Sequence, residues 1–155
     1  MQKTTAFELF KLLLLFLMGG MIYFAIELAY KGDSHFSMYL VGGLSFVLIG
    51  ALNSYFDKEM TLLRQMLLSA LIITALEFIS GCVVNLWLNL NVWDYSALPF
   101  NFLGQICLPF TAIWFILSFP AIFLDDFFRH NMFCEEKKRL YLPLALKRAI
   151  TRQGA

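Results

Sequence analysis

Long stretches of this sequence carry almost no charge. Residues 36–56 and 95–124 contain no charged side chain, and residues 12–30 and 65–93 contain one acid each, Glu27 and Glu77. About 20 apolar residues cross a bilayer as an α-helix, whereas barrel strands are shorter and alternate apolar with polar residues. The pattern predicts an all-α integral membrane protein, a bundle of four transmembrane helices at Leu12–Ala29, Phe36–Phe56, Gln65–Leu90 and Leu98–Leu124.

The composition excludes several classes of protein. Of 155 residues, 60% are hydrophobic and 15% are charged, and the mean hydropathy is +0.71. Soluble domains are about 45–50% apolar and about 25% charged, so a soluble enzyme is excluded. A net charge of +1 gives no general attraction to polyanions, so we expect the lipid bilayer as a partner and no nucleic acid.

Basic residues near the span ends predict the orientation, because cytoplasmic loops are rich in Lys and Arg. With both termini in the cytoplasm, only Lys31 lies outside. We therefore expect a plasma-membrane protein with a transmembrane domain over residues 1–126 and a basic cytoplasmic tail over 127–155. The cytoplasmic basic residues are Lys3, Lys11, Lys58, Arg64, Arg129, Lys137, Lys138 and Arg139.

Two acids fall inside the predicted spans. Glu77 lies about 18 Å into the third helix and Glu27 about 22 Å into the first, at 1.5 Å per residue, so they reach overlapping depths. A charge at the bilayer centre costs about 2.5–3.5 kcal/mol on insertion scales. Either the two carboxyl groups face a polar cavity, or each bonds a neighbouring helix and stabilises the fold.

A cluster of amides and aromatic residues surrounds the outer ends of the third and fourth predicted helices. We expect segment 93–99 to fold back onto the bundle, over a pocket lined by amides. Asn101 and Gln105, four residues apart, would share a face of the fourth helix, and Asp94 would accept hydrogen bonds at its start. A structural network, or an aromatic anchor in the headgroups, is the alternative. The cluster comprises Asn85, Asn89, Asn91, Trp93, Asp94, Tyr95, Asn101, Gly104 and Gln105.

Small residues at helical spacing predict close helix–helix contacts, because glycine lets backbones approach in lipid. The first helix presents Gly20, Tyr23 and Glu27 on one face, and the second presents Gly43, Gly50 and Asn53. Either Asp57 or Thr61 can cap the third helix. Pro109 and Pro120 fall inside the predicted fourth helix, where each removes a hydrogen bond and favours a kink.

Catalytic and metal-binding motifs are absent from the sequence. Cys82, Cys107 and Cys134 have no metal-ligand spacing, and His35 and His130 are predicted on opposite sides of the membrane. The sequence contains no P-loop, GxSxG or HExxH motif. We therefore expect no cofactor, no metal and no enzymatic activity.

Several strings resemble the type IV ABC-transporter permease family of CmpB-like small membrane proteins. The most specific is WDYSALPFNFLGQIC, supported by KGDSHFSM, VGGLSFVLIG and AIFLDD, and the similarity runs from Gly19 to Asp126. Phe36 and Lys31 stand where the family has Trp and Arg. The resemblance implies a four-span transport protein without naming a substrate. It also marks as recurring positions Glu27, His35, Asn53, Glu77, Asn85, Trp93, Asp94, Tyr95, Asn101 and Gln105.

Three functions are compatible with these features. The first is a transport component that works as a homo-oligomer or with partner membrane subunits. The second is a regulatory or assembly protein that binds other membrane proteins without transporting. The third, a lipid-modifying enzyme using Glu77, Asp94 and His35, lacks a nucleophile or a metal set.

Overall fold

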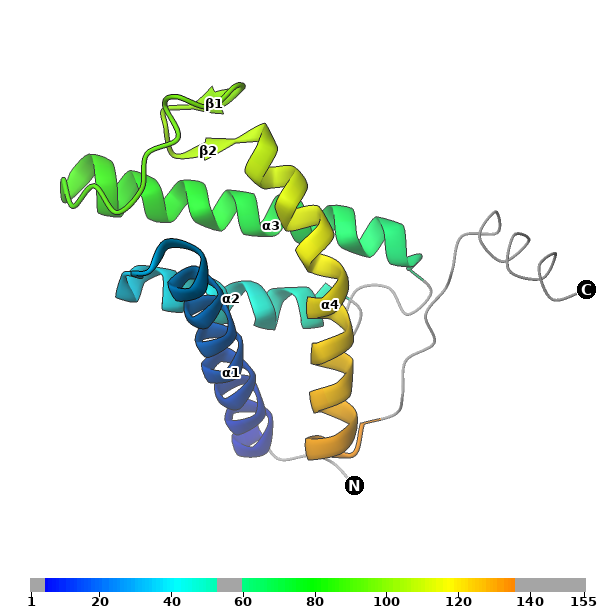
Figure 1. Ribbon diagram of the computed structural model, residues 1–155. Coiled ribbons are helices and arrows are strands. Elements are labelled where there is room, and N and C mark those ends of the chain that lie inside the picture. The colour runs from blue at the N-terminus through cyan, green and yellow to red at the C-terminus, as the bar shows by residue number, and fades with distance from the viewer. Residues whose placement is uncertain (1–4, 53–59, 136–155) are drawn as a thin grey trace, which may run out of the picture.

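A computed structural model describes residues 5–52 and 60–135. It is built of helices joined to one small hairpin, as the sequence predicts for the helices (Figure 1). Asn53, the predicted cap Asp57 and the tail beyond residue 135 lie outside the described residues. The elements are α1 (Thr5–Lys31), α2 (Phe36–Ala51), α3 (Leu62–Gly81), the π-helix η2 (Cys82–Trp87), β1 (Asn101–Phe102), β2 (Ile106–Cys107) and α4 (Leu108–Phe133).

Three of the described helices are long and apolar enough to cross a membrane: α1, the continuous α3–η2 helix and α4. The fourth, α2, is apolar but shorter, and its predicted continuation to Phe56 lies outside the described residues. Thr61 caps α3, accepting a hydrogen bond from the Arg64 backbone N–H at 3.4 Å. The prediction of an all-helical membrane bundle is confirmed at this level.

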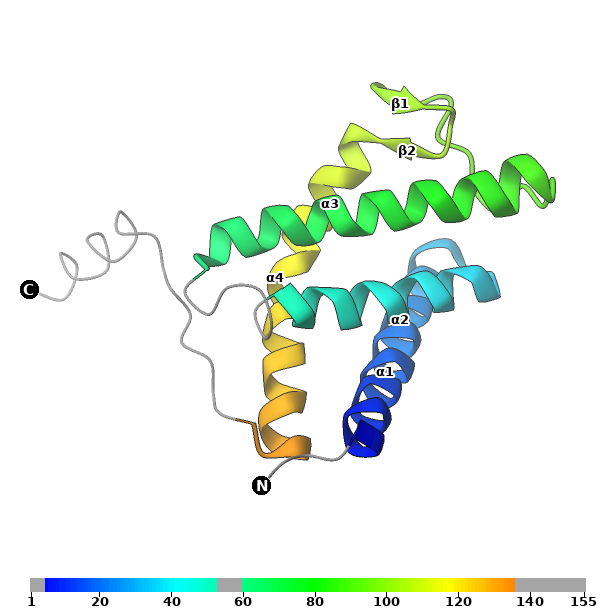
Figure 2. The ribbon, with the colours of Figure 1, turned by 180° about the vertical axis from the view of Figure 1, so that it is seen from behind.

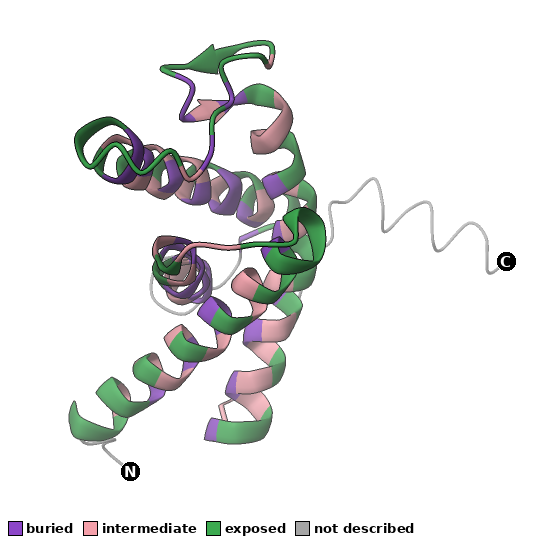
Figure 3. Cartoon of the chain, turned by 60° about the vertical axis from the view of Figure 1, so that its left-hand side comes forward, coloured by how far each residue is buried: buried purple, intermediate pink, exposed green. Residues whose placement is uncertain are grey.

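Two helices, α1 and α4, extend from a central pair formed by α2 and α3. In Figures 1 and 2, α2 and α3 run side by side, and α1 and the second half of α4 lead away from them on the same side. A core of buried apolar residues joins α2, α3 and α4 through Ile49, Ile73 and Trp114. Large apolar side chains such as Leu9 and Ile116 point outward, 64% and 65% exposed, as lipid-facing positions require. Figure 3 shows this division between inward and outward helix faces.

Glycines bring α1 and α2 together, as their spacing predicts. Gly19 and Gly20 of α1 lie against Phe46 and Tyr39 of α2. In return, Gly42 of α2 lies against Tyr23 of α1, so that aromatic rings fill the space left by the missing side chains. A Cβ at any of these glycines would collide with the partner helix, which explains why small residues occur here.

The fourth helix differs from its prediction at both ends. It begins at Leu108 instead of Leu98, which places Pro109 in its first turn, where proline costs no hydrogen bond and causes no kink. The preceding residues form the β1–β2 hairpin, with Asn101 opposite Cys107. The helix then continues to Phe133 and ends at Cys134, whose φ is 52°. The charged pair near its end, Asp125 and Arg129, is therefore helical.

Candidate functional site

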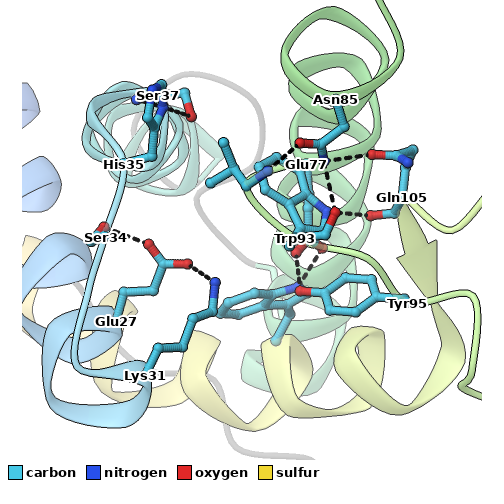
Figure 4. A network of polar contacts seen from close by, with 12 residues as sticks. Glu27, Lys31, Ser34, His35, Ser37, Glu77, Asn85, Trp93, Tyr95 and Gln105 are labelled. Atoms are coloured by element: carbon cyan, nitrogen blue, oxygen red, sulfur yellow. Dashed lines mark hydrogen bonds and ion pairs between the residues drawn. The ribbon is translucent and has the colours of Figure 1, made fainter. Parts of the chain in front are cut away.

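Glu77 joins three parts of the chain. Its carboxyl oxygens accept a hydrogen bond from the Tyr95 hydroxyl and one from the Trp114 Nε1–H of α4, each at 2.9 Å (Figure 4). The side chain is 1% exposed. Burial, followed by the nearby Glu77 carboxylate, raises the pKa of Tyr95, so its hydroxyl stays protonated and donates. Glu77 thus fixes the segment between η2 and β1 onto α3 and α4.

A second set of hydrogen bonds holds the hairpin to η2. Asn85 Nδ2 donates to the Trp93 carbonyl at 3.0 Å and to Gln105 Oε1 at 2.8 Å. Asn85 Oδ1 accepts from the Val92 backbone N–H at 2.7 Å, and Trp93 Nε1 donates to the Gln105 carbonyl at 3.0 Å. Trp93 and Tyr95 are buried. The segment therefore folds back onto the bundle, as predicted.

The arrangement of the remaining hairpin residues corrects two sequence-based predictions. Asn101 and Gln105 do not share a helical face, because both lie in the hairpin before α4. Gln105 is buried, whereas Asn101 is exposed. Asn101 Nδ2 donates to the carbonyls of Ser96 and Leu98 at 3.2 and 2.8 Å. The two buried amides, Asn85 and Gln105, bond each other, and Asn101 does not join them as predicted.

Asp94 is exposed and bonds its own turn. Its Oδ1 accepts from the Ser96 hydroxyl at 2.5 Å and from the Ser96 backbone N–H at 2.8 Å. These hydrogen bonds stabilise the charged form and lower the pKa of Asp94 below its usual range. The prediction that Asp94 accepts hydrogen bonds at the start of α4 is therefore wrong, because the hairpin separates the two in the chain and Asp94 shapes a local turn instead.

Glu27 forms an ion pair at the end of α1. Its Oε1 contacts Lys31 Nζ at 2.6 Å, and its Oε2 accepts from the Ser34 hydroxyl at 2.6 Å. His35 lies nearby in sequence but caps α2, its Nδ1 accepting from the Ser37 backbone N–H at 3.2 Å. Glu77, Asp94 and His35, the candidate acid–base groups, each have separate hydrogen-bond partners.

A cavity of about 190 Å³ lies between α1 and α4. Glu27 and Lys31 of α1 border it, opposite Tyr95 (Figure 4). Trp114 of α4, the second donor to Glu77, also lines it. The two carboxyl groups therefore approach the same cavity, Glu27 directly and Glu77 through aromatic rings. The lining is otherwise mostly apolar, with Ile26, Ile113 and Leu117, so a polar cavity at these acids stays a prediction.

Several partners are not apparent from the sequence interpretation. It places Lys31 in an outer turn, although i,i+4 spacing already connects Lys31 to Glu27. The same spacing connects Asp125 to Arg129, whose Nε contacts Asp125 Oδ2 at 2.7 Å with both side chains 2% exposed. Near the start of α1, Lys11 pairs with Glu8 at 2.5 Å and with Glu135 at 2.7 Å.

Long apolar helices with buried ionic and amide groups define the class of this protein: a helical protein embedded in a membrane. The family model described as "Putative ABC-transporter type IV" matches residues 14–144, and the chain belongs to that family. The resemblance inferred from the sequence is thus confirmed, and the protein is related to membrane transport. No curated protein and no solved structure matches the chain significantly.

Proposed function

We propose that this protein is a transport component of the plasma membrane that works as a homo-oligomer or with partner membrane subunits. The observation that carries the proposal is the cavity between α1 and α4, in a chain of the ABC-transporter type IV family. Ionisable groups at the border of an apolar helical bundle are costly, so they generally serve folding or the passage of a solute. The cavity borders Glu27 and Lys31, which favours passage.

Partners are part of the proposal because one chain offers little space for a solute. The cavity of about 190 Å³ is smaller than typical ligand pockets of about 300–1,000 Å³. The sequence holds no P-loop, so an ATPase subunit would supply the energy, and the chain itself would not be an enzyme. Exposed apolar faces, such as Leu63, Leu67 and Leu71 of α3, offer surfaces to further helices.

Both termini lie in the cytoplasm in this proposal, because the basic residues favour that side. A phosphatase reporter, active only outside, should be silent when fused after Ala155 and active when inserted at Gly32. A fluorescent reporter that folds only in the cytoplasm should give the opposite result. Reversed signals at both positions would contradict the orientation.

The transport proposal is tested in proteoliposomes. Purified chain, alone and with the subunits that co-purify with it, is supplied with ATP and a defined mixture of small metabolites. Mass spectrometry of the vesicle contents should show at least one solute enriched over empty vesicles. Enrichment should vanish in the Glu27→Gln variant and persist in Glu8→Gln, a matched control at the far end of α1. No enrichment in any mixture would reject transport.

A regulatory or assembly role is the second candidate, and the hairpin favours it. Phe100, Phe102 and Leu103 are 82%, 58% and 60% exposed, while the polar groups beneath them bond one another. Such a rigidly held apolar tip is suited to contact another membrane protein. Stoichiometric co-purification of one partner, lost in Phe100→Ser and without any solute flux, would support this role over transport.

A further inference from the structure

The cavity between α1 and α4 has a wall of aromatic rings. The Tyr95 and Phe110 rings are stacked with centroids 4.5 Å apart, Phe110 and Trp114 are 6.4 Å apart, and Trp114 and Tyr23 are 5.6 Å apart. All four side chains line the cavity, together with Tyr30. Three of these residues come from α1 or the loop before β1, and two from α4, so the wall exists only in the folded bundle.

Carboxyl groups lie on both sides of this wall. Glu27 lines the cavity directly and is 8% exposed. Glu77 lies on the other side and accepts hydrogen bonds from the Tyr95 hydroxyl and the Trp114 indole N–H. The hydroxyl and the indole N–H donate from the rims of their rings, so these hydrogen bonds do not cover the ring faces, although Tyr95 and Phe110 cover one face of each other. Lys31 supplies the one ammonium group among the described residues that line the cavity.

We propose that this cavity binds a quaternary alkylammonium cation. Aromatic faces attract such cations, which cannot donate N–H hydrogen bonds and are weakly hydrated. Glu27 supplies the counter-charge and is held in place by Ser34. Lys31 neutralises Glu27 in this structure, and because its side chain is 29% exposed it can turn outward when the ligand enters.

The ligand enters from the surface of the bundle. Tyr30, Ile26 and Ile113 line the cavity and are 75%, 49% and 43% exposed, so the cavity opens beside α1 and α4. A quaternary ammonium group occurs both in dissolved cations and in the choline headgroup of lipids. The inference goes beyond the proposed function, because binding is expected whether or not the chain transports.

Calorimetric titration of the full chain in non-ionic detergent tests the charge requirement. Choline is the probe, and 3,3-dimethylbutan-1-ol is its neutral isostere of nearly the same shape. Choline should bind and the isostere should not, because only the cation is attracted by ring faces and by Glu27. Equal binding of both compounds, or no binding of choline, would overturn the proposal.

Two variants test the ring wall and its specificity. Phe110→Leu should weaken choline binding roughly fivefold to thirtyfold, the equivalent of one cation–π contact. Phe127→Leu, an exposed phenylalanine of the same helix outside the cavity, should leave it unchanged. Both variants should elute and melt like the wild type. If folded Phe110→Leu binds choline as tightly as the wild type does, the role of the ring wall is contradicted.

Lys31→Met distinguishes a cation site from an anion site. Removing the internal competitor should tighten choline binding several-fold, whereas Glu27→Gln should weaken it roughly tenfold or more. Ser34 still holds Glu27 in the Lys31 variant, so the carboxylate stays in place. Weaker binding in Lys31→Met would overturn the proposal, because it would show that the ammonium attracts the ligand.

Nanodiscs distinguish the two sources of the cation. In discs of phosphatidylglycerol alone, choline should bind as in detergent. If a lipid headgroup is the natural ligand, added phosphatidylcholine should compete with choline and remain with the chain after extraction. If a dissolved cation is the ligand, choline affinity should be the same in discs with and without phosphatidylcholine. No choline binding and no retained phosphatidylcholine in either disc would reject the site.

Discussion

Glu77 and Asp125 are both buried carboxyl groups within long helices, 1% and 2% exposed, but their surroundings differ. Glu77 accepts hydrogen bonds from two neutral donors, Tyr95 and Trp114. Asp125 pairs with the guanidinium of Arg129 one helical turn away. The dipoles of two neutral donors therefore stabilise the Glu77 carboxyl group, whereas a full opposite charge stabilises that of Asp125.

The two groups also differ in what their partners contact. Asp125 lies against Gly50 of α2, where a Cβ would overlap the carboxylate, so the pair is packed between helices. A buried ion pair is intolerant of losing one partner, because the other charge is then stranded. The donors to Glu77 line a cavity instead, and a hydroxyl can reorient.

The largest effect is expected from breaking the ion pair of α4. Arg129→Leu should reduce the free energy of unfolding by about 3–5 kcal/mol, because Asp125 is left buried without its guanidinium. Unfolding of the purified chain in mixed micelles, followed by circular dichroism, measures the loss.

The double variant Asp125→Leu/Arg129→Leu is the control. It should recover a large part of the stability lost in Arg129→Leu, since the Asp125 carboxylate is removed together with its guanidinium partner. If both variants are equally unstable, the loss reflects packing of the long Arg129 side chain and not its charge. If Arg129→Leu is as stable as the wild type, the comparison with Glu77 fails.

Glu77 should show a smaller effect that depends on the substitution. Glu77→Leu leaves the Tyr95 hydroxyl and the Trp114 indole N–H buried without an acceptor, at a cost of about 1–3 kcal/mol. Glu77→Gln keeps the shape and one carbonyl oxygen, and the Tyr95 hydroxyl can accept from the new amide. This variant should therefore unfold nearly as the wild type does in the same assay.

Transport measurements on Glu77→Gln sharpen the comparison. A folded Glu77→Gln protein without solute enrichment in proteoliposomes would assign the carboxyl group to function. Full transport in Glu77→Gln together with a destabilised Glu77→Leu would assign it to the fold, like Asp125. Wild-type stability and transport in both variants would contradict either role.

Asp94 should have the smallest effect, because it is exposed. Its pKa in the folded chain is lowered by Ser96, so the turn is stabilised above the usual aspartate pKa and loses this contribution as the pH falls through the lowered value. Asp94→Asn should lower the melting temperature slightly near neutral pH. The difference between the variant and the wild type should shrink as the pH falls below the usual aspartate range, because the carboxyl group then becomes protonated. A constant difference at every pH would show that charge plays no part.

Parts of the site could be predicted because their signals are local. An acid in an apolar stretch must be buried with a partner, which marks Glu77 and Glu27 without any knowledge of the fold. Aromatic residues in a connecting segment likewise indicate that Trp93 and Tyr95 pack onto the bundle. The identity of the partners is not local: Trp114 lies 37 positions from Glu77, and nothing in the spacing connects them.

The boundaries of α4 show where local signals fail. Residues 98–107 are mostly apolar, and hydropathy records composition but not backbone conformation. The structure instead has Phe100 and Leu103 at φ of 53° and 52° and Gly104 at 67°, which builds a hairpin. The hairpin is stabilised by bonds from Asn85 and Trp93, which are distant in sequence.

The sequence by itself determined that this chain is a helical membrane protein of its family, with glycine contacts between α1 and α2. Whether a helix can cross a bilayer depends on the composition of about 20 consecutive residues, and this composition can be read directly from the sequence. Tertiary structure alone decided which groups meet: Glu77 with Trp114, Asn85 with Gln105, and the rings around the cavity. Those contacts depend on how helices cross and where α4 begins, and the hydrogen bonds across the hairpin help to set both.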